Sequence, residues 1–129
     1  MDHRLGRQVL AELTFCDHEA ANDPALLEEL LRRAAAESGA TLLNVYVHRF
    51  EPIGLSGVAI LAESHLAVHT WPELSYAAVD AFTCGDHVEP TTAVRVLEEG
   101  LKSGYATKIE LNRGMHTLPT AVPGATTYR

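Results

Sequence analysis

The chain has 129 residues, and 10 Lys and Arg against 17 Asp and Glu give it a formal net charge of −7 at pH 7. With 47% hydrophobic and 21% charged residues, the composition is that of one globular domain over residues 1–129 and excludes a disordered chain. The acidic balance argues against nucleic-acid binding, which relies on clustered lysine and arginine. No apolar run approaches the ~20 residues of a membrane span, and residues 1–4 lack the apolar core of a signal peptide. We therefore expect a cytoplasmic protein without nucleic-acid or membrane partners.

The first half of the chain predicts a strand, a helix and a second strand. Residues 6–15 alternate between apolar and polar positions, as in a half-buried strand. The apolar positions are Val9, Ala11, Leu13 and Phe15. Asp23 and Pro24 provide a cap and a first-turn proline for a helix that ends near Gly39. Alternation returns after Thr41, with Leu43, Val45 and Val47 expected on one side of a strand.

The second half predicts three short strands, a helix and a last strand. The strands at 57–62, 66–71 and 76–82 are joined by connections too short for crossover helices, so they are expected to be antiparallel neighbours. Pro90 opens an amphipathic helix that is expected to stop at Gly104, and residues 106–111 form the last strand. The order predicts an α+β two-layer sandwich, a mostly antiparallel sheet with two helices on one face. The other face needs cover if it is apolar.

Reactive side chains are concentrated between residues 63 and 86. His65 and His69 are four apart, a metal-binding spacing on a helix, but in a strand they would lie ~13 Å apart, so no metal site is expected. Ser56, Ser64, His69 and Cys84 are residue types used in nucleophilic and acid–base catalysis. Spacing alone is a weak signal, and a non-catalytic module that binds a small ligand is an alternative.

The whole string of motifs is more specific. They are Glu63-Ser64-His65, His69-Thr70-Trp71-Pro72-Glu73, Tyr76-Ala77-Ala78-Val79-Asp80 and Phe82-Thr83-Cys84-Gly85. In this order they resemble the core of the bacterial S-adenosylmethionine decarboxylase proenzymes, which are pyruvoyl-dependent. Further similar segments extend the resemblance to about residue 113, and the tail, 114–129, matches nothing useful.

The resemblance implies a proenzyme that processes itself. The hydroxyl of Ser64 would attack the carbonyl of Glu63 and cut the chain into 1–63 (the β chain) and 64–129 (the α chain). Ser64 would become a pyruvoyl cofactor, which forms a Schiff base with the amine of S-adenosylmethionine and accepts the electrons released with carbon dioxide. The product would be decarboxylated S-adenosylmethionine, the aminopropyl donor for spermidine and other polyamines.

The resemblance also implies roles for other residues. His69 matches the proton acceptor of processing, and Ser56 matches a serine that assists it. Cys84 matches the acid that protonates the decarboxylated substrate, since an unperturbed thiol keeps its proton at pH 7. Cys16 has no matching role and is interpreted as structural. The residues that match substrate-binding positions are Phe50, Trp71 and Glu73.

The spacing of Ser64 and His69 poses a geometric problem. In a straight strand, residues five apart face opposite sides of the sheet and lie ~16 Å apart. Two solutions are open: a bend or bulge near residues 65–70, or a serine that reaches the histidine by another route, for example from a partner chain. The resemblance implies homodimers with active sites at or near the subunit interface.

Some pocket positions depart from the family pattern. Leu74 and Ser75 stand where the family commonly has Tyr-Gly, and Glu51 and Ile53 replace more apolar or aromatic residues. A pocket that lacks aromatic walls could accept a smaller amine. A pyruvoyl-dependent arginine or ornithine decarboxylase on the same fold is therefore the main alternative.

Overall fold

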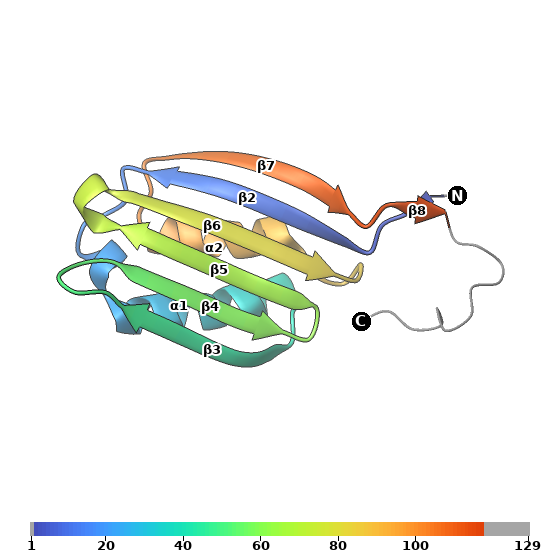
Figure 1. Cartoon of the computed structure of the whole chain (residues 1–129), viewed down its shortest axis with the longest axis horizontal. Helices are drawn as coiled ribbons and strands as arrows, with labels where there is room; N and C mark the ends of the chain where they lie inside the picture. The colour runs from blue at the N-terminus through green and yellow to red at the C-terminus, as the bar shows by residue number, and fades with distance from the viewer. Residues whose placement is uncertain (1, 118–129) are drawn as a thin grey trace.

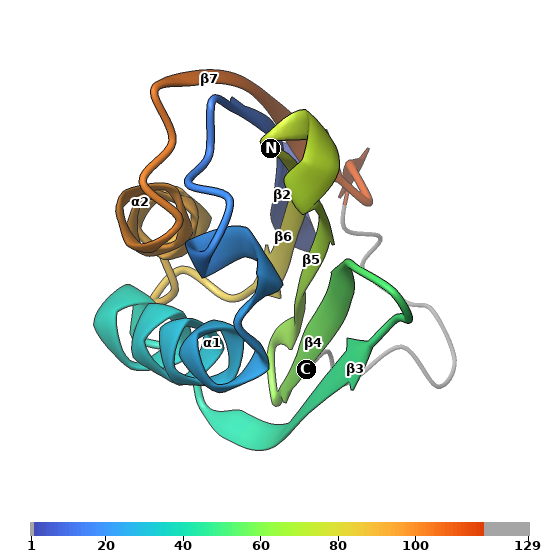
Figure 2. The same ribbon diagram turned by 90° about the vertical axis from the view of Figure 1, so that its left-hand side faces the viewer.

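A computed structural model describes residues 2–117 and has the predicted α+β architecture. Two helices cover one face of a six-stranded antiparallel sheet (Figures 1 and 2). The elements are β1 (Asp2–His3), β2 (Gly6–Thr14), η1 (Ala20–Asn22), α1 (Pro24–Ser38), β3 (Leu42–Arg49), β4 (Leu55–Leu61), β5 (Ser64–Trp71), η2 (Pro72–Leu74), β6 (Tyr76–Cys84), α2 (Pro90–Gly100), β7 (Tyr105–Arg113) and β8 (His116–Thr117).

The sheet has the order β3-β4-β5-β6-β2-β7, and all neighbours are antiparallel. The first long strand, β2, is therefore inserted between β6 and the last long strand, β7 (Figure 1). The short connections of β3 to β6 make consecutive strands neighbours, as predicted. β1 and β8 form a separate two-residue ladder.

Helix α1 begins and ends where the sequence indicates. The Asp23 carboxylate accepts a hydrogen bond from the Leu26 N–H at 3.1 Å, Pro24 occupies the first turn, and Gly39 ends the helix with φ 86°. Its leucines face the sheet, and Gly57 of β4 lets the helix approach closely, because a Cβ there would lie 2.9 Å from a Leu31 methyl carbon. The core between helices and sheet is made of alanine, valine and leucine side chains.

Three predicted details are wrong. Phe15 lies beyond the end of β2 with φ 57° and is 75% exposed, because the left-handed residue turns the chain out of the strand. Leu43 is 63% exposed, because a register shift between Leu42 and Asn44 reverses the alternation that Val45 and Val47 follow. Helix α2 ends at Gly100, not at Gly104, because Lys102 adopts φ 56° and breaks the helical path.

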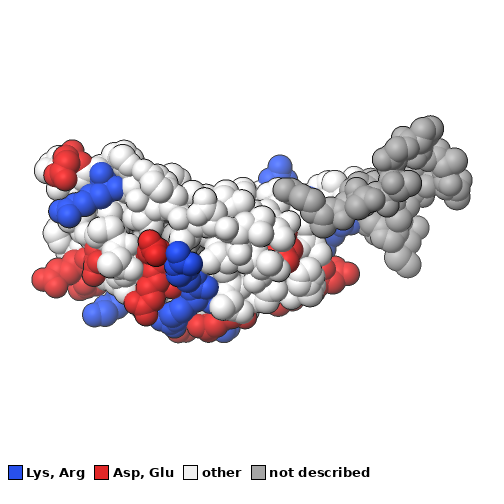
Figure 3. All heavy atoms as spheres, turned by 90° about the horizontal axis from the view of Figure 1, so that it is seen from below, with Lys and Arg blue, Asp and Glu red and all other residues white. Residues whose placement is uncertain are grey.

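The sheet face opposite the helices, which we call the open face, carries exposed apolar side chains. They belong to Leu10, Tyr46, Ile60, Ile109 and Leu111, and alternation and register place all five on this face. In the view from below, charged side chains gather over α1 on the lower side of the molecule and are sparse on the upper side (Figure 3). Exposed apolar side chains gathered on one face are a feature of surfaces that contact other proteins. No helix within residues 2–117 has the length and hydropathy to span a membrane.

Candidate active site

The Glu63–Ser64 peptide bond lies in the tight turn between β4 and β5, and both residues are buried. The Glu63 carbonyl accepts a hydrogen bond from the Cys84 backbone N–H at 2.7 Å. Ser64 adopts φ 133°, a region that residues with side chains rarely occupy. Backbone strain of this kind costs about 1–3 kcal/mol and is concentrated at functional sites. The predicted cleavage site is therefore a strained and anchored turn.

Cys84 ends β6 beside this turn. Its Sγ lies 3.6 Å from Ser64 Oγ, and the thiol is buried with the serine. Across the ladder, Gly6 of β2 leaves room for the Cys84 side chain. A Cβ at Gly6 would lie 2.6 Å from the Thr83 carbonyl oxygen and 3.3 Å from Cys84 Sγ. Register places Gly6, Phe82 and Cys84 on the open face, so Cys84 lies at one end of that face. Ser64 pairs with Thr83 on the helix side of the sheet, and its Oγ approaches the Cys84 thiol from there.

Replacing Gly6 with alanine is expected to disturb the end of β6 around Cys84. The new methyl group would meet a backbone oxygen that cannot move without displacing β6. We expect a loss of about 1–3 kcal/mol in the free energy of unfolding, measured by urea denaturation, together with slower chain cleavage. Gly104→Ala is the control, because its Cβ would meet side-chain atoms of the exposed Phe15. Equal stability of both variants would contradict the prediction.

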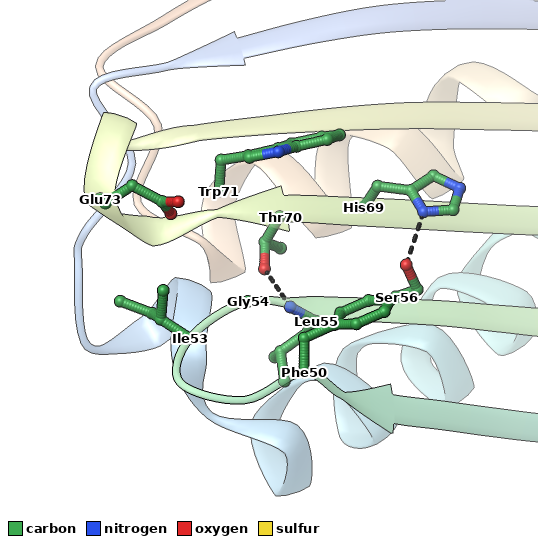
Figure 4. A pocket seen from close by; sticks show the side chains of 9 residues that line it. All are labelled: Phe50, Ile53, Gly54, Leu55, Ser56, His69, Thr70, Trp71 and Glu73. Atoms are coloured by element: carbon green, nitrogen blue, oxygen red, sulfur yellow. Dashed lines mark hydrogen bonds between the residues drawn. The ribbon is translucent and has the colours of Figure 1, made fainter.

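Ser56 and His69 form a second pair. They lie opposite each other on β4 and β5, and Ser56 Oγ is 2.7 Å from His69 Nδ1 (Figure 4). Both side chains project from the open face, and His69 is exposed. The hydrogen bond orients the imidazole and leaves its other ring nitrogen, Nε2, turned away from Ser56 (Figure 4). This arrangement suits a base whose Nε2 accepts a proton from a group that does not belong to β4 or β5 of the same chain.

The two pairs are far apart in one chain. β5 keeps an unbroken register from Ser64 to Trp71, so a bend or bulge within residues 65–70, one of the two predicted solutions, is wrong. Ser64 and His69 are therefore separated by about five strand residues, or ~16 Å. Ser64 is the first residue of β5, whereas the Ser56–His69 pair lies near the other end of the strand (Figure 4).

A pocket of about 390 Å³ adjoins the Ser56–His69 pair. It contains all three predicted substrate residues, Phe50, Trp71 and Glu73 (Figure 4). Phe50 and Trp71 are 46% and 42% exposed, so their rings are available to a ligand. The ring of Trp71 packs beside that of Tyr76, with ring centroids 5.5 Å apart. Two aromatic faces and one carboxylate suit a ligand with a flat ring, a positive charge and hydroxyl groups.

The remaining predicted groups have structural partners. His65 Nε2 lies 3.2 Å from the Asp80 carboxylate, and no cluster of three or more metal-binding side chains occurs among the described residues. Cys16 is buried and its thiol approaches the Leu13 carbonyl oxygen at 3.6 Å. Burial raises the pKa of Cys16, and a hydrogen bond with Ser103 offsets this in part. Both features fit a structural thiol.

The sequence did not indicate the partners of the Glu63 side chain. Its carboxylate is buried and receives hydrogen bonds from the Thr41 N–H at 2.9 Å, the Thr41 hydroxyl at 3.2 Å and His87 Nε2 at 2.9 Å. Burial alone would raise the pKa of Glu63, but the hydrogen bonds from Thr41 and His87 outweigh it and hold the pKa below its ordinary value. Thr41 and His87 are distant from Glu63 in the sequence. The one sequence feature that points to either of them is that His87 closely follows Cys84 and Gly85.

Comparison with known proteins decides the family. Residues 7–114 match the family model for S-adenosylmethionine decarboxylase. The chain belongs to the S-adenosylmethionine decarboxylase family. The predicted resemblance is thereby confirmed.

Individual members of the S-adenosylmethionine decarboxylase family match nearly the whole chain. The S-adenosylmethionine decarboxylase proenzyme of Moorella thermoacetica is 50% identical over 117 residues, which cover 91% of this chain and 94% of that protein. The proenzyme of Caldicellulosiruptor saccharolyticus is 46% identical over 120 residues, covering 93% and 97%. The crystal structure of the adenosylmethionine decarboxylase from Aquifex aeolicus VF5 superposes with a TM-score of 0.84 at 31% identity and covers 92% of this chain and 98% of that one. The predicted fold class is confirmed by this match.

Proposed function

We propose that this chain is a proenzyme that cuts itself between Glu63 and Ser64 and then decarboxylates S-adenosylmethionine. The observation that carries the proposal is the strained Ser64, with its preceding carbonyl held by the Cys84 N–H and its hydroxyl 3.6 Å from the Cys84 thiol. The relatives, named as proenzymes of this decarboxylase and matched over nearly their whole length, favour this function over the arginine or ornithine alternative and over a non-catalytic module.

Self-cleavage begins with an acyl shift. Ser64 Oγ forms a bond to the Glu63 carbonyl carbon, the peptide C–N bond breaks, and the hydroxyl proton goes to the released Ser64 amine. Negative charge that develops on the Glu63 oxygen is stabilised by the Cys84 N–H, which already donates to it at 2.7 Å. The product is an ester that links the two parts of the chain.

Elimination and hydrolysis complete the cut. A base removes the α-proton of Ser64, the ester C–O bond breaks, and Glu63 leaves as a carboxylate. The remaining dehydroalanine takes up water and releases ammonia, which leaves a pyruvoyl group at position 64. We assign the base to His69: with its proton on Nδ1 directed at Ser56 Oγ, Nε2 is free to accept another.

The residues around Ser64 fit a group of this kind. When formed, the pyruvoyl group supplies the carbonyl that reacts with the substrate amine and takes up electrons as carbon dioxide leaves. Cys84 would deliver a proton to the substrate carbon, because its thiol is already beside position 64. Phe50 and Trp71 would hold the adenine ring and the sulfonium, and Glu73 would accept hydrogen bonds from the ribose hydroxyls.

We further propose that the active site is shared between two copies of the chain. Cys84, whose thiol contacts Ser64 Oγ, and the Ser56–His69 pair lie toward opposite ends of the open face. A twofold axis through the middle of that face would place the Ser56–His69 pair and the pocket of one protomer against the Ser64–Cys84 pair of its partner. The homodimer also covers the exposed apolar side chains and resolves the ~16 Å separation within one chain.

Intact-mass spectrometry and a substrate panel test the proposed function. The purified protein is expected to yield two chains, 1–63 and 64–129, the second blocked at its N-terminus by a pyruvoyl group. Release of carbon dioxide is expected from S-adenosylmethionine and not from arginine or ornithine. A single uncut chain would contradict self-processing, and activity on a basic amino acid alone would contradict the substrate assignment.

A further inference from the structure

The side chain of Glu63 is held more tightly than an ordinary turn residue requires. Most residues at the tip of a strand connection are exposed, but the Glu63 side chain is 9% exposed and its carboxylate receives three hydrogen bonds. Two come from Thr41, at the entrance to β3, and one comes from His87, in the loop between β6 and α2. Thr41 and His87 bind the side-chain carboxylate of Glu63, which takes no part in the proposed bond changes.

The scissile turn is anchored on both sides. Thr41 donates its N–H to the Glu63 carboxylate, and its carbonyl accepts the Ala62 N–H at 2.9 Å. On the other side, the Cys84 N–H holds the Glu63 carbonyl at 2.7 Å. The Glu63 carboxylate and the Ala62 N–H are thus both bound to Thr41, and the Glu63 carbonyl is bound to the end of β6, which leaves the strain at Ser64.

The His87 ring is positioned by its own loop. Gly85 has φ 87°, and a Cβ there would lie 3.0 Å from the His87 ring. Gly39, at the end of α1, lies so close that its Cβ would be 2.7 Å from the His87 carbonyl oxygen. The Glu89 N–H donates to the Ser38 carbonyl at 2.9 Å and ties the same loop to α1. The ring is 62% exposed, so the fold does not need it to fill the core.

We infer that Thr41 and His87 are positioning residues for self-cleavage, which hold the Glu63 carboxylate so that the Glu63 carbonyl carbon stays within reach of Ser64 Oγ. This inference rests on the proposed function. The acyl shift needs a fixed angle between the hydroxyl and the carbonyl, and small displacements of reacting atoms cost large factors in rate. Releasing the carboxylate lets the turn relax its strain by rotating the carbonyl away from the serine.

The test follows chain cleavage by intact mass after cell-free synthesis of the full chain. Loss of one hydrogen bond to a charged group is expected to slow cleavage of His87→Ala at least about tenfold. His87→Gln keeps an N–H donor and is expected to recover most of the rate, and Thr41→Val, which loses only the hydroxyl contact, is expected to show a smaller slowing. His18→Ala, at an exposed histidine away from the site, is the matched control and is expected to cleave like the wild type.

A second readout separates positioning from a general structural role. Hydroxylamine cuts esters and spares amides, so uncut His87→Ala chains are expected to resist it, because the block precedes the acyl shift. The melting temperature of His87→Ala is expected to stay near that of His18→Ala. Wild-type cleavage rates in His87→Ala, hydroxylamine-sensitive uncut chains, or equal slowing in His87→Gln would each overturn the inference. A wild-type chain that is never cut would instead overturn the proposed function.

Discussion

Replacing Ser64 with alanine is expected to leave one uncut chain of 129 residues without decarboxylase activity. The substitution removes the hydroxyl that, in the proposed cleavage, would attack the Glu63 carbonyl and from which the pyruvoyl group would form. Alanine keeps the Cβ, so the turn retains its anchors at Thr41, His87 and Cys84. Intact mass gives the fraction cut, and carbon dioxide release from S-adenosylmethionine gives the activity. We expect both to fall by more than about 10³-fold, as on loss of a nucleophile.

Cys84→Ala is the matched variant, because it separates the backbone of Cys84 from its side chain. The N–H that holds the Glu63 carbonyl remains, so the chain is expected to be cut. The thiol beside position 64 is lost. Turnover per cut chain is therefore expected to fall, or the decarboxylated substrate is expected to be protonated at the wrong atom. If Ser64→Ala chains were cut, or Cys84→Ala left turnover unchanged, the assignment of these two residues would be wrong.

Most of the fold follows from local signals in the sequence. Asp23, Pro24 and Gly39 bound α1, and short connections dictate antiparallel neighbours. The errors arise where one residue changes the backbone path. A left-handed Phe15 ends β2, and a register shift beside Leu43 reverses the side of the sheet to which its side chain points. Apolar alternation continues through both points, so the pattern alone could not detect them.

The site is less predictable, because it depends on which residues face each other across strands. The identities of Ser64 and Cys84 come from the resemblance, but their 3.6 Å contact follows from the pairing of β5 with β6 and from the unusual φ of Ser64. The pairing of Ser56 with His69 likewise depends on the register of β4 and β5. His87 reaches Glu63 through a loop whose course is set by contacts with the end of α1. Single-sequence patterns carry no information on such long-range pairings.

The register of β5 has the largest consequence for mechanism. It excludes a bulge that would bring His69 to Ser64 within one chain, and it leaves the Ser56–His69 pair on the open face, where Cys84, the neighbour of Ser64, also lies. A shared site then predicts that two inactive variants complement each other. Ser64→Ala keeps His69 but lacks the proposed nucleophile, and His69→Ala keeps Ser64 but lacks the proposed base. Each variant alone is expected to release no 64–129 chain.

Co-expression of Ser64→Ala with His69→Ala is expected to restore cleavage. In a mixed dimer, His69 of the first chain faces Ser64 of the second, so one of the two sites is complete. Random pairing puts about half of the His69→Ala chains into mixed dimers, and about that fraction is expected to be cut. Mass identifies the product, because the released 64–129 chain must carry alanine at position 69.

The control replaces the first partner with a chain that carries both Ser64→Ala and His69→Ala. No His69 is then present in either protomer, and cleavage is expected to disappear while dimers still form. Recovery of activity should follow the number of cut chains, because each complete site also brings the Phe50 and Trp71 pocket against a processed position 64. If the mixture stays uncut although mixed dimers are detected by native mass spectrometry, the base and the nucleophile do not meet across the interface. His69 would then have to act within its own chain, through a rearrangement of β5 that breaks its continuous ladder with β4 and β6.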